Sequence, residues 1–86
     1  MSLKQKLQRD LLLALLQCDG TPMPENSLLE AAMIMRRVDK PTLGDAQDAL
    51  KDIEAEGYAT GLSEPLQERS WTLTTKGTHK ARQLRS

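Results

Sequence analysis

Apolar positions between residues 3 and 18 recur at the spacing of an amphipathic helix. The members of this stripe are Leu3, Leu7, Leu11, Ala14, Leu15 and Cys18. Residues at i, i+4 and i+7 share one face of a helix with 3.6 residues per turn, and the charged residues fall mostly on other faces. Asp19 and Gly20 then end the pattern, since glycine readily takes the left-handed conformation that follows a helix. The pattern predicts an N-terminal helix over residues 3–18 with a buried face.

A second helix is predicted after a short extended segment. Pro22 and Pro24 exclude a helix interior there, and Asn26 is a suitable N-cap. The helix should stop by about Asp39, because Pro41 disfavours helical angles at Lys40. Its predicted core stripe consists of Leu28, Ala31, Ala32, Met35 and Val38.

The third helix has the clearest start in the sequence. Thr42 precedes Asp45 by three residues, which is a variant of the capping box, and Gly57 ends the helix. Its predicted core stripe is narrow and consists of Leu43, Ala46, Ala49, Leu50 and Ile53. Because only a few residues separate the second and third helices, the two together are typical of a helix-turn-helix.

The period of the pattern then changes from helix to strand. Larger and smaller side chains alternate over residues 58–62 and 70–74, with a polar loop at 63–68 between them. Thr74 or Thr75 can then cap a final short helix that runs through Leu84. The predicted fold class is α+β, with a three-helix core, a two-stranded wing and a short C-terminal helix.

Two segments carry a resemblance to known proteins. DALKDIEAEGY, residues 48–58, resembles the end of the third helix and the first wing strand of MarR-type and PadR-type regulators. WTLTTKGTHKA, residues 71–81, resembles their second wing strand and following helix. The whole chain is also similar to small winged-helix proteins of Mu-like prophages. The resemblance implies one winged helix-turn-helix domain over residues 1–86, with the third helix in the major groove of DNA and the wing on its backbone.

Composition narrows the classes of function. The 86 residues include 12 basic and 12 acidic side chains, one His and one Cys, and the five glycines stand singly. This inventory supplies neither a metal-ligand cluster nor a phosphate-binding loop, so we expect no enzymatic activity, no metal and no cofactor. The longest apolar run has six residues, and no signal-peptide pattern is present, so we expect no membrane partner and a cytoplasmic protein.

The charge of the third helix argues against DNA as the partner. Residues 41–57 contain five acidic side chains and one lysine, and the predicted outward face includes Asp48, Lys51 and Asp52. An acidic helix repels the phosphates that line a groove. The alternative is therefore a winged helix that binds another protein and does not bind DNA.

If the partner is double-stranded DNA, the sequence offers two sets of contact residues. Phosphates would be held by Arg36, Arg37, Lys40, Arg69 and Lys76, while Thr42, Gln47 and Lys51 would reach bases. The same cations also fit an ordinary solvated surface.

The remaining notable residues have structural interpretations. Trp71, Tyr58 and Cys18 are predicted in the core, and His79 at the surface. The first helix has more leucines at the edge of its apolar stripe than a small core needs. These leucines either form a homodimer seam or are covered by the last helix. These seam candidates are Leu12, Leu13 and Leu16.

Overall fold

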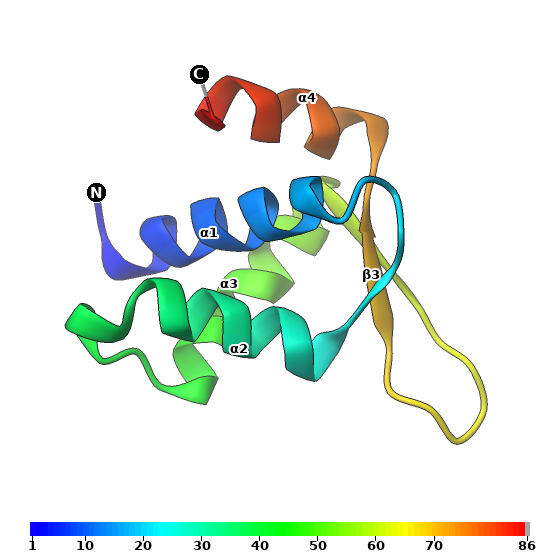
Figure 1. Cartoon of the computed structure of the whole chain (residues 1–86), viewed down its shortest axis with the longest axis horizontal. Coiled ribbons are helices and arrows are strands. Elements are labelled where there is room, and N and C mark those ends of the chain that lie inside the picture. Colours follow the sequence, from blue (N-terminus) through cyan, green and yellow to red (C-terminus); the bar gives the residue numbers. More distant parts are fainter. Residues whose placement is uncertain (86) are drawn as a thin grey trace.

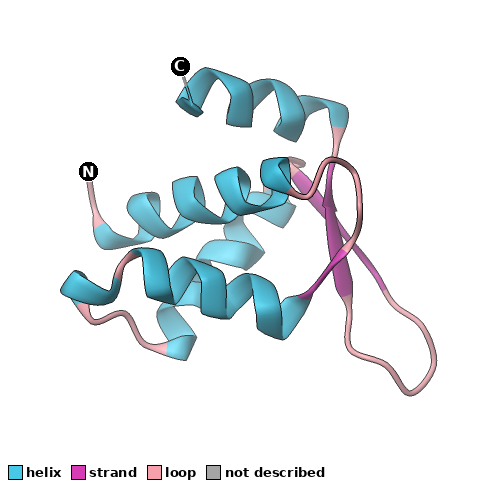
Figure 2. Ribbon diagram, viewed as in Figure 1, coloured by secondary structure: helices cyan, strands magenta, loops and turns pink. Residues whose placement is uncertain are grey.

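The computed structural model describes residues 1–85 and has the element order of a winged helix-turn-helix (Figure 1). The elements are α1 (Leu3–Gln17), β1 (Met23–Pro24), α2 (Glu25–Met35), the 3-10 helix η1 (Arg37–Asp39), α3 (Leu43–Ala55), β2 (Ala59–Leu62), β3 (Ser70–Leu73) and α4 (Thr75–Arg85). Helices and an antiparallel sheet occupy separate parts of the molecule (Figure 2). The predicted α+β class is confirmed.

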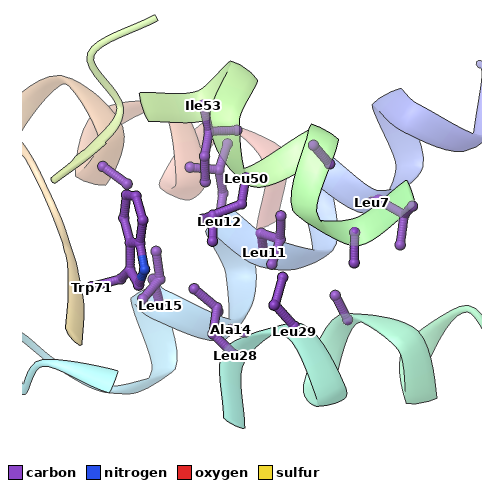
Figure 3. Close-up of a cluster of buried hydrophobic side chains, with 14 of the residues drawn as sticks. Leu7, Leu11, Leu12, Ala14, Leu15, Leu28, Leu29, Leu50, Ile53 and Trp71 are labelled. Atoms are coloured by element: carbon purple, nitrogen blue, oxygen red, sulfur yellow. The ribbon is translucent and has the colours of Figure 1, made fainter. Parts of the chain in front are cut away.

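Helix α1 lies at the centre of the molecule and packs against α2, α3 and α4, with α4 on the side away from α2 (Figure 1). Its leucines meet side chains from α2, α3 and β3 in one core (Figure 3). The buried apolar residues are Leu7, Leu11, Leu12, Ala14, Leu15, Leu28, Leu29, Ala32, Ala46, Ala49, Leu50, Ile53, Ala59, Trp71 and Ala81. Trp71 is the largest of them, which confirms it as a core residue.

Two capping boxes fix the starts of α1 and α3. The predicted box at Thr42 and Asp45 is present, with each side chain bonded to the backbone N–H of the other residue. Ser2 and Gln5 form a second box at α1, which was not predicted although its serine and glutamine have the right spacing. Both helices therefore begin at defined residues.

The sheet has three strands in the order β1-β3-β2, so the expected two-stranded wing is one part of a larger sheet. The added strand, β1, pairs Met23 with Trp71 across the edge of β3. Pro24 lies in this edge strand, where a residue without an N–H is tolerated. The prolines at 22 and 24 predict the extended backbone of this segment but not its pairing with β3.

The positions of β2 that face the core and those that face solvent are the reverse of what the alternation predicts. Ala59 faces the core, whereas Leu62 is half-exposed and Tyr58 precedes the strand. The register pairs Gly61 with Trp71. Tyr58 is only partly buried and packs at the margin of the core. Cys18 also differs from the prediction, since it is partly exposed at the C-terminal end of α1.

The largest departure from the prediction is at the end of α2. The helix ends at Met35 rather than near Asp39, and η1 follows, with Lys40 in the left-handed conformation at φ 51°. This break takes Val38 out of the expected stripe of α2, with an exposure of 88%. Leu43, which was expected in the core stripe of α3, is the first residue of that helix and is 52% exposed. Met35 is half-exposed as well, and Leu29 is the residue that the core gains from α2.

A buried ion pair joins α1 to the C-terminal end of α2. Asp10 is 2% exposed, and its carboxylate accepts two hydrogen bonds from Arg36, from Nε at 2.5 Å and from Nη2 at 3.2 Å. This hydrogen bonding raises the pKa of Arg36 above its ordinary value. Bidentate pairs of this kind fix orientation as well as charge, so Arg36 helps to set how α2 lies on α1.

Gly77 is required where the first turn of α4 lies against the backbone of Tyr58, between α3 and β2. A Cβ at this position would lie 1.7 Å from the carbonyl oxygen of Tyr58, which also accepts a hydrogen bond from the Thr74 N–H. We expect Gly77→Ala to lower the free energy of unfolding by about 1–3 kcal/mol, as overpacked sites do. Urea unfolding measures this loss.

Gly44→Ala is the matched control for that substitution. The nearest atom to a Cβ at Gly44 is the Thr42 hydroxyl at 3.7 Å, and the residue lies in the first turn of α3. The control should leave stability unchanged or raise it, since alanine favours helices over glycine. Equal losses in the two variants would contradict the close approach at Gly77.

Candidate nucleic-acid interface

Helix α3 is the element that a winged helix presents to DNA, and one side of it is tied to α1. Asp52 lies 2.6 Å from Lys4 Nζ and accepts a hydrogen bond from Gln8 at 3.1 Å. The hydrogen bond to Asp52 raises the pKa of Lys4 above 10.5. Asp52 was assigned to the outward face from the sequence, and that assignment is wrong, because its carboxylate turns toward α1.

The other side of α3 is tied to the base of the wing. Arg69 Nη2 donates a hydrogen bond to Glu54 at 2.9 Å, and its guanidinium lies 4.6 Å from the centre of the Trp71 ring. Gly61 allows this stacking, since a Cβ there would lie 2.5 Å from the guanidinium. Arg69 therefore positions the wing against α3.

These two pairings change the electrostatics of the outward edge of α3. Lys4 and Arg69 each place a positive charge beside a carboxylate that the sequence count treated as unpaired. The polar side chains exposed between the two sides are those of Gln47, Asp48 and Lys51. The repulsion that α3 offers to a phosphate is therefore lower than its own sequence indicates.

A groove lies between α3 and the sheet, with a volume of about 390 Å³. It is lined by Glu25, Gln47, Leu50, Lys51, Glu54, Arg69 and Trp71. Trp71 Nε1 donates to Glu25 at 3.0 Å, and the Glu25 N–H donates to the Arg69 carbonyl at 2.9 Å. The structure thus brings three of the predicted contact residues, Gln47, Lys51 and Arg69, to one place. Glu25 and Glu54 were missed because only the tertiary fold brings them to Trp71 and Arg69.

Two further cations stand at the amino end of α3. Arg37 and Lys40 are exposed in and after η1, and within residues 1–85 neither side chain forms an ion pair. Arg36 differs from them, because it is held by Asp10. Of these three predicted phosphate contacts, Arg36 therefore has a structural role, and Arg37 and Lys40 face solvent.

The remaining candidates also have structural partners. The Thr42 hydroxyl accepts the N–H of Asp45 as an N-cap. Lys76 donates to the carbonyl of Glu56 at 2.7 Å, and its Nζ lies 4.9 Å from the centre of the Tyr58 ring. A cation at this place suits the C-terminal end of α3, where backbone carbonyls have no helical partner.

The three seam candidates on α1 are not equivalent. Leu12 is a core residue with an exposure of 3%, so it has almost no surface left for a partner. Leu16 packs against the core from its margin, and Leu13 is partly exposed. His79 is exposed, as predicted, and its ring contacts Gln83.

None of the helices formed by residues 1–85 has the length and apolar character needed to span a bilayer. The same part of the chain holds no group of three or more His, Cys, Asp or Glu side chains placed to bind a metal ion.

Comparison with known proteins supports the fold. No family model and no curated protein matches the chain. The crystal structure of SSV1 F-93 is similar to it, with a TM-score of 0.69 and 22% sequence identity, over 90% of this chain and 80% of that one. At this identity the likeness concerns the fold, and it agrees with the winged helix-turn-helix architecture described above.

Proposed function

We propose that this domain is a small, non-enzymatic module that binds double-stranded DNA and takes part in transcription regulation. The observation that carries the proposal is the pairing of Asp52 with Lys4 and of Glu54 with Arg69. Each carboxylate at the sides of α3 thereby has a cation beside it, which weakens its repulsion of phosphate. The resemblance of residues 48–58 and 71–81 to MarR-type and PadR-type regulators, and to winged-helix proteins of Mu-like prophages, agrees with this function.

The proposed contacts follow from the side chains left on the outward edge. The Gln47 amide suits adenine and the Lys51 ammonium suits guanine in the major groove. Arg37 and Lys40 would hold phosphates at the amino end of α3, where the helix dipole also favours negative charge. Glu64 and Glu68 keep the wing loop away from phosphates, so we assign most of the contact to α3 rather than to the wing.

A salt series of binding to random duplex tests this function. Since few cations contribute, we expect binding near the weak end of the usual non-specific range of about 10⁻⁴ to 10⁻⁶ M, and a steep loss as salt rises. Arg37→Gln/Lys40→Gln should weaken binding at every duplex sequence and lower the salt slope by about 1 for each phosphate contact removed.

The matched control removes the same amount of charge from α4. Arg82 and Arg85 lie on that helix, and Arg82 is beside Leu16 and Asp19 at the end of α1 rather than beside α3. Arg82→Gln/Arg85→Gln should leave the salt slope unchanged. Equal weakening by the two double variants, or no duplex binding by the wild type at low salt, would contradict docking through α3.

A second candidate function is supported by a different observation. Four large apolar side chains, Ile34, Met35, Val38 and Leu43, are exposed around the turn between α2 and α3. Such a surface suits a protein partner better than a nucleic acid. A protein-interaction winged helix is therefore the alternative if duplex binding is not found.

We also propose a cytoplasmic location, in line with the expectation from the sequence. The homodimer seam expected on α1 is retained only for Leu13 and Leu16, since Leu12 is buried within one chain. Leu13 is the residue whose replacement tests that seam.

A further inference from the structure

Large exposed apolar side chains gather in two regions. The first, here called the corner, is residues 34–43, with Ile34, Met35, Val38 and Leu43. The second, the wing tip, is residues 62–68, with Leu62 at 49% exposure and Leu66 fully exposed at φ 64°. Met1 is the only other large apolar residue with comparable exposure in residues 1–85. In both regions these apolar side chains leave about half or more of their surface exposed.

The two regions carry opposite charge. The corner contains Arg37 and Lys40, which have no ion pair within the described residues, whereas its one acid, Asp39, lies 3.8 Å from Lys6. The wing tip contains Glu64 and Glu68 and no basic residue. Glu68 accepts one weak hydrogen bond from the Asn26 N–H at 3.3 Å, and Glu64 has no ion pair in residues 1–85.

One chain cannot bring the two regions together. The corner lies at one end of the long axis, where α2 turns toward α3, and the wing loop lies at the other end (Figure 1). The molecule extends 35 Å along that axis. Contact between corner and wing tip is therefore available only between two molecules.

We propose that the wing tip of one copy docks on the corner of a second copy. Leu62 and Leu66 would cover the apolar side chains of the corner, and Glu64 and Glu68 would face Arg37 and Lys40. Of the partners that an apolar, basic surface can take, an apolar, acidic one fits best, and this chain carries such a segment itself. Burial of leucines supplies the attraction, and the charges set the orientation.

The contact is heterologous, because different surfaces of the two copies meet. Each bound copy still has a free corner or a free wing tip, so association continues with rising concentration or closes into a ring. This differs from a seam on α1, which would stop at a dimer. The proposal does not rest on DNA binding, although a corner occupied by a wing tip leaves Arg37 and Lys40 unable to hold phosphates.

Sedimentation velocity over a wide concentration range tests the contact. We expect the average mass of the wild type to rise with concentration, and Leu66→Ser or Val38→Ser to remove the rise. Both side chains are exposed, so circular dichroism should show both variants folded. Leu13→Ser is the control and should associate like the wild type. A wild type that stays monomeric, or a loss of association in Leu13→Ser but not in Leu66→Ser, would overturn the proposal.

Charge reversal tests the pairing of the two regions directly. Arg37→Glu/Lys40→Glu makes the corner acidic, and Glu64→Lys/Glu68→Lys makes the wing tip basic. Each variant alone presents like charges at the contact and should remain monomeric. An equal mixture pairs opposite charges at both contacts and should regain association. A mixture that stays monomeric would show that these charges do not face one another.

Discussion

Replacement of Arg36 with Gln is expected to lower the free energy of unfolding by about 3–5 kcal/mol, which is the usual cost of removing one partner of a buried ion pair. The cause is the Asp10 carboxylate, which is 2% exposed and would be left without its cation. Folded proteins have about 5–15 kcal/mol of stability in total, so the variant should lose a large share of it. Urea unfolding at neutral pH measures the loss.

Two comparisons separate this effect from a general loss of positive charge. Arg37→Gln removes the neighbouring charge from an exposed side chain and should change stability by less than about 0.5 kcal/mol. Asp10→Leu/Arg36→Met removes both charges and should be more stable than Arg36→Gln, since no charge is then left buried. Equal losses in Arg36→Gln and Arg37→Gln would mean that the ion pair does not hold α2 to α1.

The second large effect is expected in the core of α3. Ile53 is 1% exposed and lies among the leucines of α1 (Figure 3). We expect Ile53→Ala to cost about 2–5 kcal/mol, through lost burial and the cavity that remains. Leu50→Ala should behave alike, because Leu50 is buried in the same cluster. Urea unfolding or thermal melts give the measurement.

Leu43→Ala is the control that distinguishes the structure from the sequence pattern. Leu43 and Ile53 share one predicted stripe of α3, so the pattern alone predicts similar losses for both. In the structure Leu43 is 52% exposed, and its replacement should cost much less than that of Ile53. A large loss from Leu43→Ala would place that residue in the core after all.

Most of the fold could be predicted from the sequence, because the patterns that indicate its helices and strands each involve only a few neighbouring residues. The capping box at Thr42, the change of period after Gly57 and the alternation around Trp71 depend on a few neighbouring residues, and these patterns gave the helix-turn-helix and the hairpin. The strand at Met23 could not be predicted in this way. Its partner is Trp71, far along the chain, and the two prolines beside Met23 gave only an extended conformation.

The candidate interface was harder to predict, because the charged residues that pair in the structure lie far apart in the sequence. The count over residues 41–57 treats Asp52 and Glu54 as exposed acids, yet Lys4 on α1 and Arg69 on the wing pair with them. Arg36 and Arg37 are adjacent in sequence, but one is held by a buried carboxylate and the other faces solvent. Periodicity likewise assigned Val38 to the core, because it cannot detect the break at Met35.

The central place of α1 has a consequence for the chain while it is being made. α1 is synthesised early, but part of its packing comes from α4, and the contact between Arg9 and Leu84 joins residues 75 positions apart. Since a domain cannot complete its core before its last element is available, nascent α1 keeps apolar surface uncovered until α4 is released. Chains that stop before Thr75 would expose that surface permanently and would be prone to aggregate or to be degraded.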